Sequence, residues 1–449
     1  MRRRASPAGA LLALFVASCA SSFDSGSTLK GLRILGIQKD KPYAHPGETV
    51  HLKMLFDDPR SQFNHVDGAD AGHKSISVQW LAGCVNPQAD SFIGCAERFS
   101  QLKELPPSET NTVDFALTLP GDDGKHGIIS DHRSPPNYRA DPFGTEFVFF
   151  AICAGDLHLT LDQVPPFRCT SPSGQVLGAP DFVFGYTEVF AYRELRNQNP
   201  KIAQTDEDAQ MPTAPGFQTG MLVDGQYVPV DCIGDACIEL EQEEFRIASG
   251  QPTLPGPGGV SVDAGDAGPL LEDAGRPRLD GGKSLLDAGR ASFDAGRPSS
   301  SGGSRADAGG GLLALPAPPN CDPNLATPDT RCFKQCTDSD QNKCDKHSIK
   351  LLVTKDSAEP DAVANQLENR TDPNNQLEEQ MWINYYTDAG KLEHEVKLLN
   401  DATTKWNPNH SADLRAPQKL GAFHVWAVAH DNRGGSQWVR ATLSTMNPY

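Results

Sequence analysis

The sequence predicts a mainly β protein with two immunoglobulin-like β-sandwich domains, the second interrupted by a long disordered insert. Three observations predict this class. Short apolar stretches alternate with polar residues at the period of two that a half-buried strand requires, without a sustained 3.6-residue period. Gly, Pro, Asn and Asp separate these stretches at the short intervals typical of sandwiches. A Gly- and Asp-rich tract with little apolar surface to bury divides the second set of strands.

The N-terminus predicts a cleaved lipoprotein signal over residues 1–18 and a lipidated tether over 19–29. Three arginines precede a short apolar run that closes in small residues, which is the pattern of a secretory signal and not of a membrane span. The closing Val16-Ala17-Ser18-Cys19 resembles the bacterial lipobox, in which the Cys takes a diacylglyceryl group and its freed amino group is acylated, with palmitate as the expected acid. Several acyl chains on one residue anchor a protein stably.

The residues after Cys19 indicate where the anchored protein resides. In enterobacterial lipoproteins an Asp directly after the lipidated Cys holds the protein at the inner membrane, whereas here Ala20-Ser21-Ser22 follows. By that resemblance the expected location is the bacterial outer membrane or the cell surface.

Residues 30–196 are expected to form the first sandwich. The turn Pro46-Gly47 precedes an alternating strand over 50–54. The run over 147–153 is apolar on both faces, as a central strand should be. Trp80 stands where a sandwich places a central Trp. Further strands are expected at 32–37, 76–80, 113–119 and 182–192.

Residues 197–245 and 320–449 are expected to form the second sandwich together, the latter piece beginning with a Cys-rich segment. The earlier piece has about 50 residues and is too small to fold alone. The clearest part of the later piece is a hairpin whose turn is Asp431-Asn432-Arg433-Gly434-Gly435. Its strands are expected at 423–430 and 438–443, with others at 349–353 and 381–386.

Residues 246–319 are expected to be a disordered insert rich in Asp-Ala-Gly, Pro and Ser. Positions 250–311 hold 16 of the 41 glycines, and Phe293 is their only aromatic residue. The tripeptide Asp-Ala-Gly recurs without a fixed period, which predicts a biased tract and not a solenoid. A calcium-binding β-roll also repeats Gly and Asp, but its nonapeptide is absent. The tripeptide begins at Asp263, Asp266, Asp273, Asp287, Asp294 and Asp307.

Ten cysteines remain when Cys19 is set aside, an even number in a chain that the signal sends to an oxidising compartment. Five disulfides are therefore expected. Cys84 is predicted to pair with Cys95, and Cys153 with Cys169, because each pair joins a strand end to the loop that follows. Among the last four cysteines the connectivity stays open, with a zinc site as the alternative. The remaining cysteines are Cys232 and Cys237, then Cys321, Cys332, Cys336 and Cys344.

Four features together resemble surface lipoproteins of myxobacteria. They are the lipobox, the Asp-Ala-Gly tract, Pro46-Gly47-Glu48-Thr49-Val50 after a strand, and Val425-Trp426-Ala427-Val428 before the Gly-rich turn. The resemblance spans most of the chain and implies a fold and a location. Many of those proteins have no assigned activity, so no functional residue carries over.

The sequence contains no nucleophile elbow, phosphate loop or dinucleotide fingerprint, and no catalytic residue, metal site or cofactor is expected. A net charge of −18 without a long basic run speaks against nucleic acid as a partner. Asp338, Asp340 and Asn342 copy the start of a calcium loop, but the Gly of its sixth position is missing, so a solvated turn is expected. His126 and His132 are expected to be exposed loop side chains.

The expected function is that of a non-enzymatic, lipid-anchored envelope or cell-surface protein that serves as a scaffold for binding or assembly. Its expected partners are the membrane, through the N-terminal lipid, and envelope proteins or polysaccharide. The alternative is an envelope hydrolase acting on glycan or peptidoglycan, whose carboxylates meet only in the fold. Asp131, Glu146 and Asp156 are examples of such carboxylates.

Overall fold

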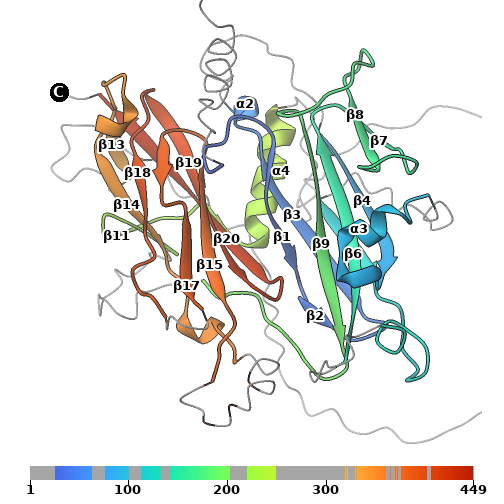
Figure 1. The fold of residues 1–449 in the computed structure, drawn as a ribbon. Coiled ribbons are helices and arrows are strands. Elements are labelled where there is room, and N and C mark those ends of the chain that lie inside the picture. Colours follow the sequence, from blue (N-terminus) through green and yellow to red (C-terminus); the bar gives the residue numbers. More distant parts are fainter. Residues whose placement is uncertain are drawn as a thin grey trace, which may run out of the picture. The chain divides into compact units, whose positions relative to one another are not determined.

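A computed structural model shows a mainly β fold of several, largely antiparallel, sheets, as the alternating sequence pattern predicts (Figure 1). The signal over 1–18, Cys19 and most of the tract over 246–319 lie outside the residues that the structure describes. The described residues are 26–62, 76–100, 113–132, 142–202, 220–248, 319, 321, 329, 331–360, 365, 370, 372, 376–401 and 406–447.

The first core lies between a three-stranded and a four-stranded sheet. The strands are β1 (Arg33–Lys39), β2 (Tyr43–Ala44), β3 (Thr49–Asp57), β4 (Ser77–Val85), β5 (Asp114–Thr118), β6 (Phe143–Cys153) and β9 (Phe182–Tyr192). The orders are β1-β3-β5 and β2-β9-β6-β4, with only the short β2 parallel to its neighbour. Trp80 is fully buried at the centre of this core, where its ring stacks on Phe115 at a centroid distance of 5.5 Å.

The other face of the four-stranded sheet carries a second, smaller cluster of apolar side chains. The elements over it are η2 (Gln88–Asp90), α3 (Phe92–Ala96), β7 (Asp156–Leu159) and β8 (Phe167–Thr170). Two disulfides fasten them to the sheet, Cys84 to Cys95 at α3 and Cys153 to Cys169 at the β7–β8 hairpin. Because both faces are covered, β6 is buried along nearly its whole length.

The second core lies between a five-stranded and a six-stranded sheet. The first sheet contains β10 (Met221–Val223), β11 (Gln226–Val228), β14 (Lys346–Leu351), β16 (Lys391–Glu393) and β18 (Ala412–Arg415). The second sheet contains β12 (Cys232–Ile233), β13 (Cys332–Lys334), β15 (Met381–Thr387), β17 (Val396–Asn400), β19 (Gly421–Asp431) and β20 (Ser436–Met446). Two short 3-10 helices are η4 (Gln341–Lys343) and η5 (Lys355–Ser357). The long hairpin β19–β20 turns at the predicted Gly-rich segment.

Chain segments on both sides of residues 249–318 lie in the same two sheets. In the five-stranded sheet β10 pairs with β14, and in the six-stranded sheet β12 pairs with β20. Leu352 adds a backbone hydrogen bond to the earlier segment, since its N–H donates to the carbonyl of Gly220 at 2.9 Å. The described residues before and after the tract therefore belong to one compact unit.

The segment over 197–245 differs from the strand-rich piece that its sequence suggested. It contains a 14-residue helix, α4 (Asp235–Ala248), directly after β12. Ile238 and Leu240 of this helix are buried in the first core, and Met221 and Val223 of β10 are buried in the second. The segment therefore contributes side chains to both cores. The Cys232–Cys237 disulfide fastens the start of the helix, and residues with good helix propensity, mostly Glu, Leu, Gln and Ala, follow.

A buried charged cluster joins α4 to the last strand. Arg440 of β20 is 2% exposed, and its Nε donates to Asp231 Oδ2 at 3.2 Å. Its Nη1 donates to Glu241 Oε1 of α4 at 2.9 Å, and the indole N–H of Trp426 donates to the same oxygen at 3.2 Å. The indole N–H of Trp438 donates to the carbonyl of Gly234 at 2.7 Å. These bonds tie the segment before the tract to the end of the chain.

Cleavage within the tract is expected to leave the two fragments associated. A specific protease site introduced beside Arg290 would divide the chain between β12 and β13, yet the β10–β14 and β12–β20 pairings would persist. Gel filtration of the cut, non-denatured protein should give one species with the elution volume of the uncut chain. Two separately eluting folded fragments would contradict this expectation.

Candidate functional site

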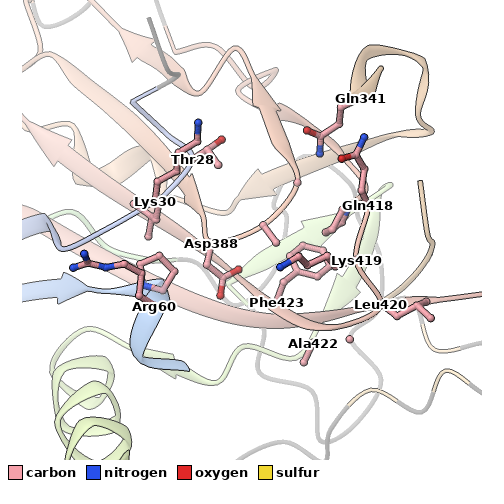
Figure 2. Close-up of a pocket in the computed structure, with 16 residues that line it drawn as sticks. Thr28, Lys30, Arg60, Gln341, Asp388, Gln418, Lys419, Leu420, Ala422 and Phe423 are labelled. Atoms are coloured by element: carbon pink, nitrogen blue, oxygen red, sulfur yellow. The ribbon is translucent and has the colours of Figure 1, made fainter. Parts of the chain in front are cut away.

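A pocket of about 500 Å³ opens where the N-terminal segment meets two turns of the second sheet pair (Figure 2). Its walls come from residues 28–30, from the short helix α2 (Pro59–Gln62), from Gln341, from the turn 388–390 and from the loop 417–423. Pockets of this size, with apolar walls and a few polar groups, are typical of small-molecule sites.

The N-terminal wall is held by strand-like pairing to the end of β15. The N–H of Leu29 donates to the carbonyl of Thr387 at 2.8 Å, and the N–H of Thr387 donates to the carbonyl of Ser27 at 2.9 Å. Leu29 is 2% exposed and packs in the first core, whereas Lys30 is exposed. The alternation of this short segment therefore buries one side chain and directs the next toward solvent.

The turn between β15 and β16 has the sequence Asp388-Ala389-Gly390, the tripeptide that also recurs in the tract. Asp388 accepts the backbone N–H of His424 at 2.8 Å, and its other oxygen lies 2.8 Å from the His424 Nδ1. Gly390 has a φ of +85°, and a Cβ there would lie 2.6 Å from the carbonyl of Arg415. The turn therefore requires Gly at its third position.

The loop 417–423 is braced by the segment that the Cys336–Cys344 disulfide closes. The N–H of Cys336 donates to the carbonyl of Pro417 at 3.0 Å, and Gln418 Nε2 donates to the carbonyl of Asp338 at 2.8 Å. From β20, Thr445 donates its hydroxyl to the carbonyl of Lys419 at 2.7 Å. These contacts hold the loop backbone while the Lys419 side chain remains exposed.

Three cationic side chains line the pocket in a chain whose net charge is −18. Lys30 and Lys419 are exposed. Arg60 is fixed in the wall, because its guanidinium binds Asp58 and also donates to Asp181 at 2.8 Å. Hydrogen bonds to these two carboxylates raise the pKa of Arg60. Arg60 is thus held in the wall by carboxylates, and Lys30 and Lys419 lie at the exposed rim of the pocket.

Among the described residues, the rest of the lining is mostly apolar, and the one carboxylate there, Asp388, is shielded. Leu29 and Phe423 are buried in the floor, and Ala422 and Leu420 are exposed, Leu420 to 50%. The Asp388 side chain is only 1% exposed. Figure 2 shows Leu420 and Lys419 on one side of the pocket and Lys30 and Arg60 on the other. The pocket thus combines an apolar surface with cationic groups.

Buried acids lie next to the α2 wall. Burial raises the pKa of Asp57 well above its ordinary value, and the neighbouring carboxylates of Glu241 and Asp388 raise it further, while Arg440 opposes the shift. Burial therefore favours the neutral form of Asp57.

A second cavity of about 740 Å³ lies over β3 and the start of α4. Its polar side chains bind one another: Lys53 Nζ lies 2.6 Å from Asp235 Oδ2, and Gln38 Nε2 donates to Gln437 Oε1 at 2.9 Å. This mutual pairing makes it a weaker candidate for a ligand than the pocket beside Lys419.

The three carboxylates of the hydrolase alternative share no hydrogen bond or ion pair among the described residues. Asp131 lies in the exposed loop after β5 and accepts the N–H of Gly127 at 2.9 Å. Asp156 is exposed at the start of β7. Glu146 is 3% exposed on β6.

Glu146 has a structural partner. The strand β4 contains a bulge between Leu81 and Cys84, and Gly83 in this bulge has a φ of +98°. The N–H of Gly83 donates to Glu146 Oε1 at 2.9 Å, but the other carboxylate oxygen is buried without a hydrogen bond. Burial raises the pKa of Glu146 to about 7, and the Gly83 bond partly opposes this shift.

The histidines of the sequence prediction have different environments. His126 is exposed, as expected. The expectation for His132 was wrong: its side chain is 2% exposed, lies 2.9 Å from Asp90 Oδ1 and packs on the ring of Phe143. The loop folds back onto the start of β6, which sequence alone does not reveal.

The calcium-like turn is closed by its own backbone. Asp338 Oδ1 accepts the N–H of Asp340 at 2.8 Å, and Asp340 Oδ1 accepts the N–H of Asn342 at 3.1 Å. Such bonds are typical of Asx turns. Within the described ranges no group of three or more His, Cys, Asp and Glu side chains is arranged to hold a metal ion. The four cysteines of open connectivity pair as Cys321–Cys332 and Cys336–Cys344.

Cys19 lies outside the described residues, so the structure places neither the anchor nor the signal. In the part of the chain that is described, no helix is both long enough and apolar enough to cross a membrane. The chain matches no family model, no curated protein and no solved structure. The functional conclusion therefore rests on the pocket and the sequence signals.

Proposed function

We propose that the protein is a non-enzymatic, lipid-anchored envelope or cell-surface protein whose two immunoglobulin-like sandwiches present the pocket beside Lys419 for binding. The lipobox ending in Cys19 supports the anchor and the outer-membrane or surface location. The resemblance to myxobacterial surface lipoproteins supports the same location. Two pairs of facing sheets support the sandwich interpretation, and the apolar-poor tract supports a disordered insert.

The observation that carries the binding proposal is the composition of the pocket. Lys419 and the exposed Leu420 lie on a loop that a disulfide-closed segment holds in place, and Lys30 is exposed on the N-terminal wall of the pocket. The lining carboxylate, Asp388, is shielded and already bound to His424. A fixed loop with exposed cationic and apolar side chains is suited to recognition, because little ordering is required when a ligand binds.

Geometry gives the hydrolase alternative less support. Two carboxylates that cleave a glycosidic bond must flank one cleft. Glu146 is instead buried beneath the β4 bulge, whereas Asp131 and Asp156 are exposed in separate segments and share no hydrogen bond or ion pair within the described part of the chain.

Cross-linking in the native envelope tests the binding proposal. The wild-type chain should capture the same envelope component repeatedly, and Leu420→Glu should lose it, because a carboxylate would face the lysines and interrupt the apolar surface. Val396→Glu is the matched control, since Val396 is also exposed, to 61%, but lies on β17 outside the pocket. Equal capture by all three proteins would refute a role for the pocket.

A further inference from the structure

The first described residues of the chain lie beside the pocket. Gly26 is exposed, and Thr28, two residues later, is part of the pocket wall. Cys19 is seven residues before Gly26 and nine before Thr28. A chain spans at most ~3.3–3.6 Å per residue, so Cys19 lies within about 25 Å of Gly26 and about 32 Å of Thr28. The pocket is therefore within reach of the lipid proposed on Cys19.

The walls of the pocket suit an apolar occupant. Leu29 and Phe423 are buried in its floor, Leu420 is 50% exposed, and Ala422 is exposed beside it. Figure 2 shows Leu420, Ala422 and Phe423 on the side of the pocket away from Thr28. The volume of about 500 Å³ is typical of pockets that enclose a small ligand. Each methylene group that moves from water onto such a surface is stabilised.

The charged groups of the lining are compatible with an acyl chain. Arg60 is bound by two carboxylates, and Asp388, whose side chain is 1% exposed, is bound to His424. These partners stay in place when an apolar group enters, so no charge loses its hydrogen bonds. Lys30 and Lys419 are exposed at the rim, where a long side chain keeps its ammonium group in water above an apolar occupant.

We propose that the pocket holds one acyl chain of the lipid on Cys19 of the same molecule while the protein is in water, and releases it when the protein is anchored. The bilayer takes every acyl chain of the residue, whereas the pocket takes one, so the membrane is the preferred site. This inference rests on the proposed anchor and gives the proposed binding pocket a regulated state. The pocket is filled by its own lipid in water and is open to an envelope partner at the membrane.

Photo-cross-linking from the acyl chain tests the proposal on the lipidated full-length protein. Cells are supplied with a diazirine analogue of palmitate, and the purified protein is moved from detergent into buffer and irradiated. Cross-links should map to the loop 417–423 and to the N-terminal wall of the pocket. Phosphatidylcholine vesicles added before irradiation should lower these cross-links about tenfold, because the acyl chains enter the bilayer.

A mixture of two isotopic forms identifies whose acyl chain fills the pocket. The diazirine-labelled protein is mixed with an equal amount of isotopically heavy protein that lacks the diazirine, and the mixture is irradiated in buffer. Only light peptides should carry cross-links, since each pocket holds the chain of its own molecule. Equal cross-linking to heavy and light peptides would overturn this assignment and identify a second copy as the source of the occupant.

Two variants alter the pocket in different ways. Ala422→Trp places a large ring in it, and Leu420→Glu sets a carboxylate beside the acyl chain. Each should lower the cross-links in buffer about tenfold, as the loss of two buried methylene groups already would. Leu420 lies in a loop, so its substitution tests the pocket even where Trp disturbs β19. Val396→Trp, at an exposed position of β17 outside the pocket, is the matched control and should behave like the wild type.

The outcomes separate this inference from the proposals on which it rests. Acylated protein with the same cross-links in the wild type and in both pocket variants would overturn the inference. The anchor, and capture of an envelope component by the pocket, would then still stand. A wild-type chain that takes up no more acyl label than Cys19→Ala would defeat the anchor and this inference together.

Discussion

Replacement of Arg440 by Met is expected to lower the free energy of unfolding by about 3 to 5 kcal/mol, measured by urea denaturation at pH 7. Arg440 is 2% exposed and bonds to Asp231 and Glu241. Met fills a similar volume but leaves two buried carboxylates without their cation. Because Glu241 lies on α4 and Arg440 on β20, the loss also weakens the attachment of the helix.

Two further variants show whether the loss arises from charge. Arg196→Met removes an ion pair with Glu48 whose two side chains are 44% and 32% exposed, and it should cost no more than about 1 kcal/mol. Adding Glu241→Gln to Arg440→Met should recover part of the lost stability, because one buried charge disappears. A loss below about 1 kcal/mol for Arg440→Met, equal to that of Arg196→Met, would contradict the description of a buried charged cluster.

Glu146→Gln is expected to stabilise the protein at pH 8 by up to about 3 kcal/mol and to leave its stability near pH 4.5 almost unchanged. Burial raises the pKa of Glu146 to about 7 in the folded state. The stability that protonated Glu146 contributes is fully present below its unfolded-state pKa, near 4.5. It is lost as the pH rises through the folded-state pKa of about 7. Gln is neutral at every pH, and its carbonyl can still accept the N–H of Gly83.

The matched substitution at Glu393 should change the free energy of unfolding in the opposite direction. The guanidinium of Arg415 lowers the pKa of Glu393, so its ionised form is favoured by folding and its contribution is lost as pH falls through the lowered folded-state pKa. Glu393→Gln should therefore not stabilise the protein at pH 8. Unfolding curves collected from pH 4.5 to 8 compare both variants with the wild type. The Glu146 account fails if Glu146→Gln and the wild type keep parallel stability profiles across this range.

Local patterns predicted much of the β structure. The alternation over 50–54 became β3, the doubly apolar run over 147–153 became β6, and the Gly-rich turn at 431–435 joined β19 to β20. The disulfides Cys84–Cys95 and Cys153–Cys169 were also predictable, since each joins residues that are close in sequence. Such features depend on neighbours along the chain.

Features that depend on distant contacts were not predictable. Helix α4 was missed because its run of Glu residues looks like a solvated segment until Arg440, almost 200 residues away, supplies the partner of Glu241. The pocket was missed for the same reason. Lys30 and Lys419 carry no motif, and they line one pocket only because Leu29 pairs with the end of β15. The repeated tripeptide at Asp388 offered a signal, since between two strands it forms a tight turn.

Mass spectrometry of the mature N-terminus tests the lipid-anchor proposal most directly. The protein is extracted from envelope membranes with detergent and digested with trypsin, which should release a peptide from Cys19 to Lys30. We predict that this peptide begins at Cys19 and carries a diacylglyceryl group and an amide-linked fatty acid. A mature chain that begins at another residue, or an unmodified Cys19 thiol in the membrane-derived protein, would contradict the proposal.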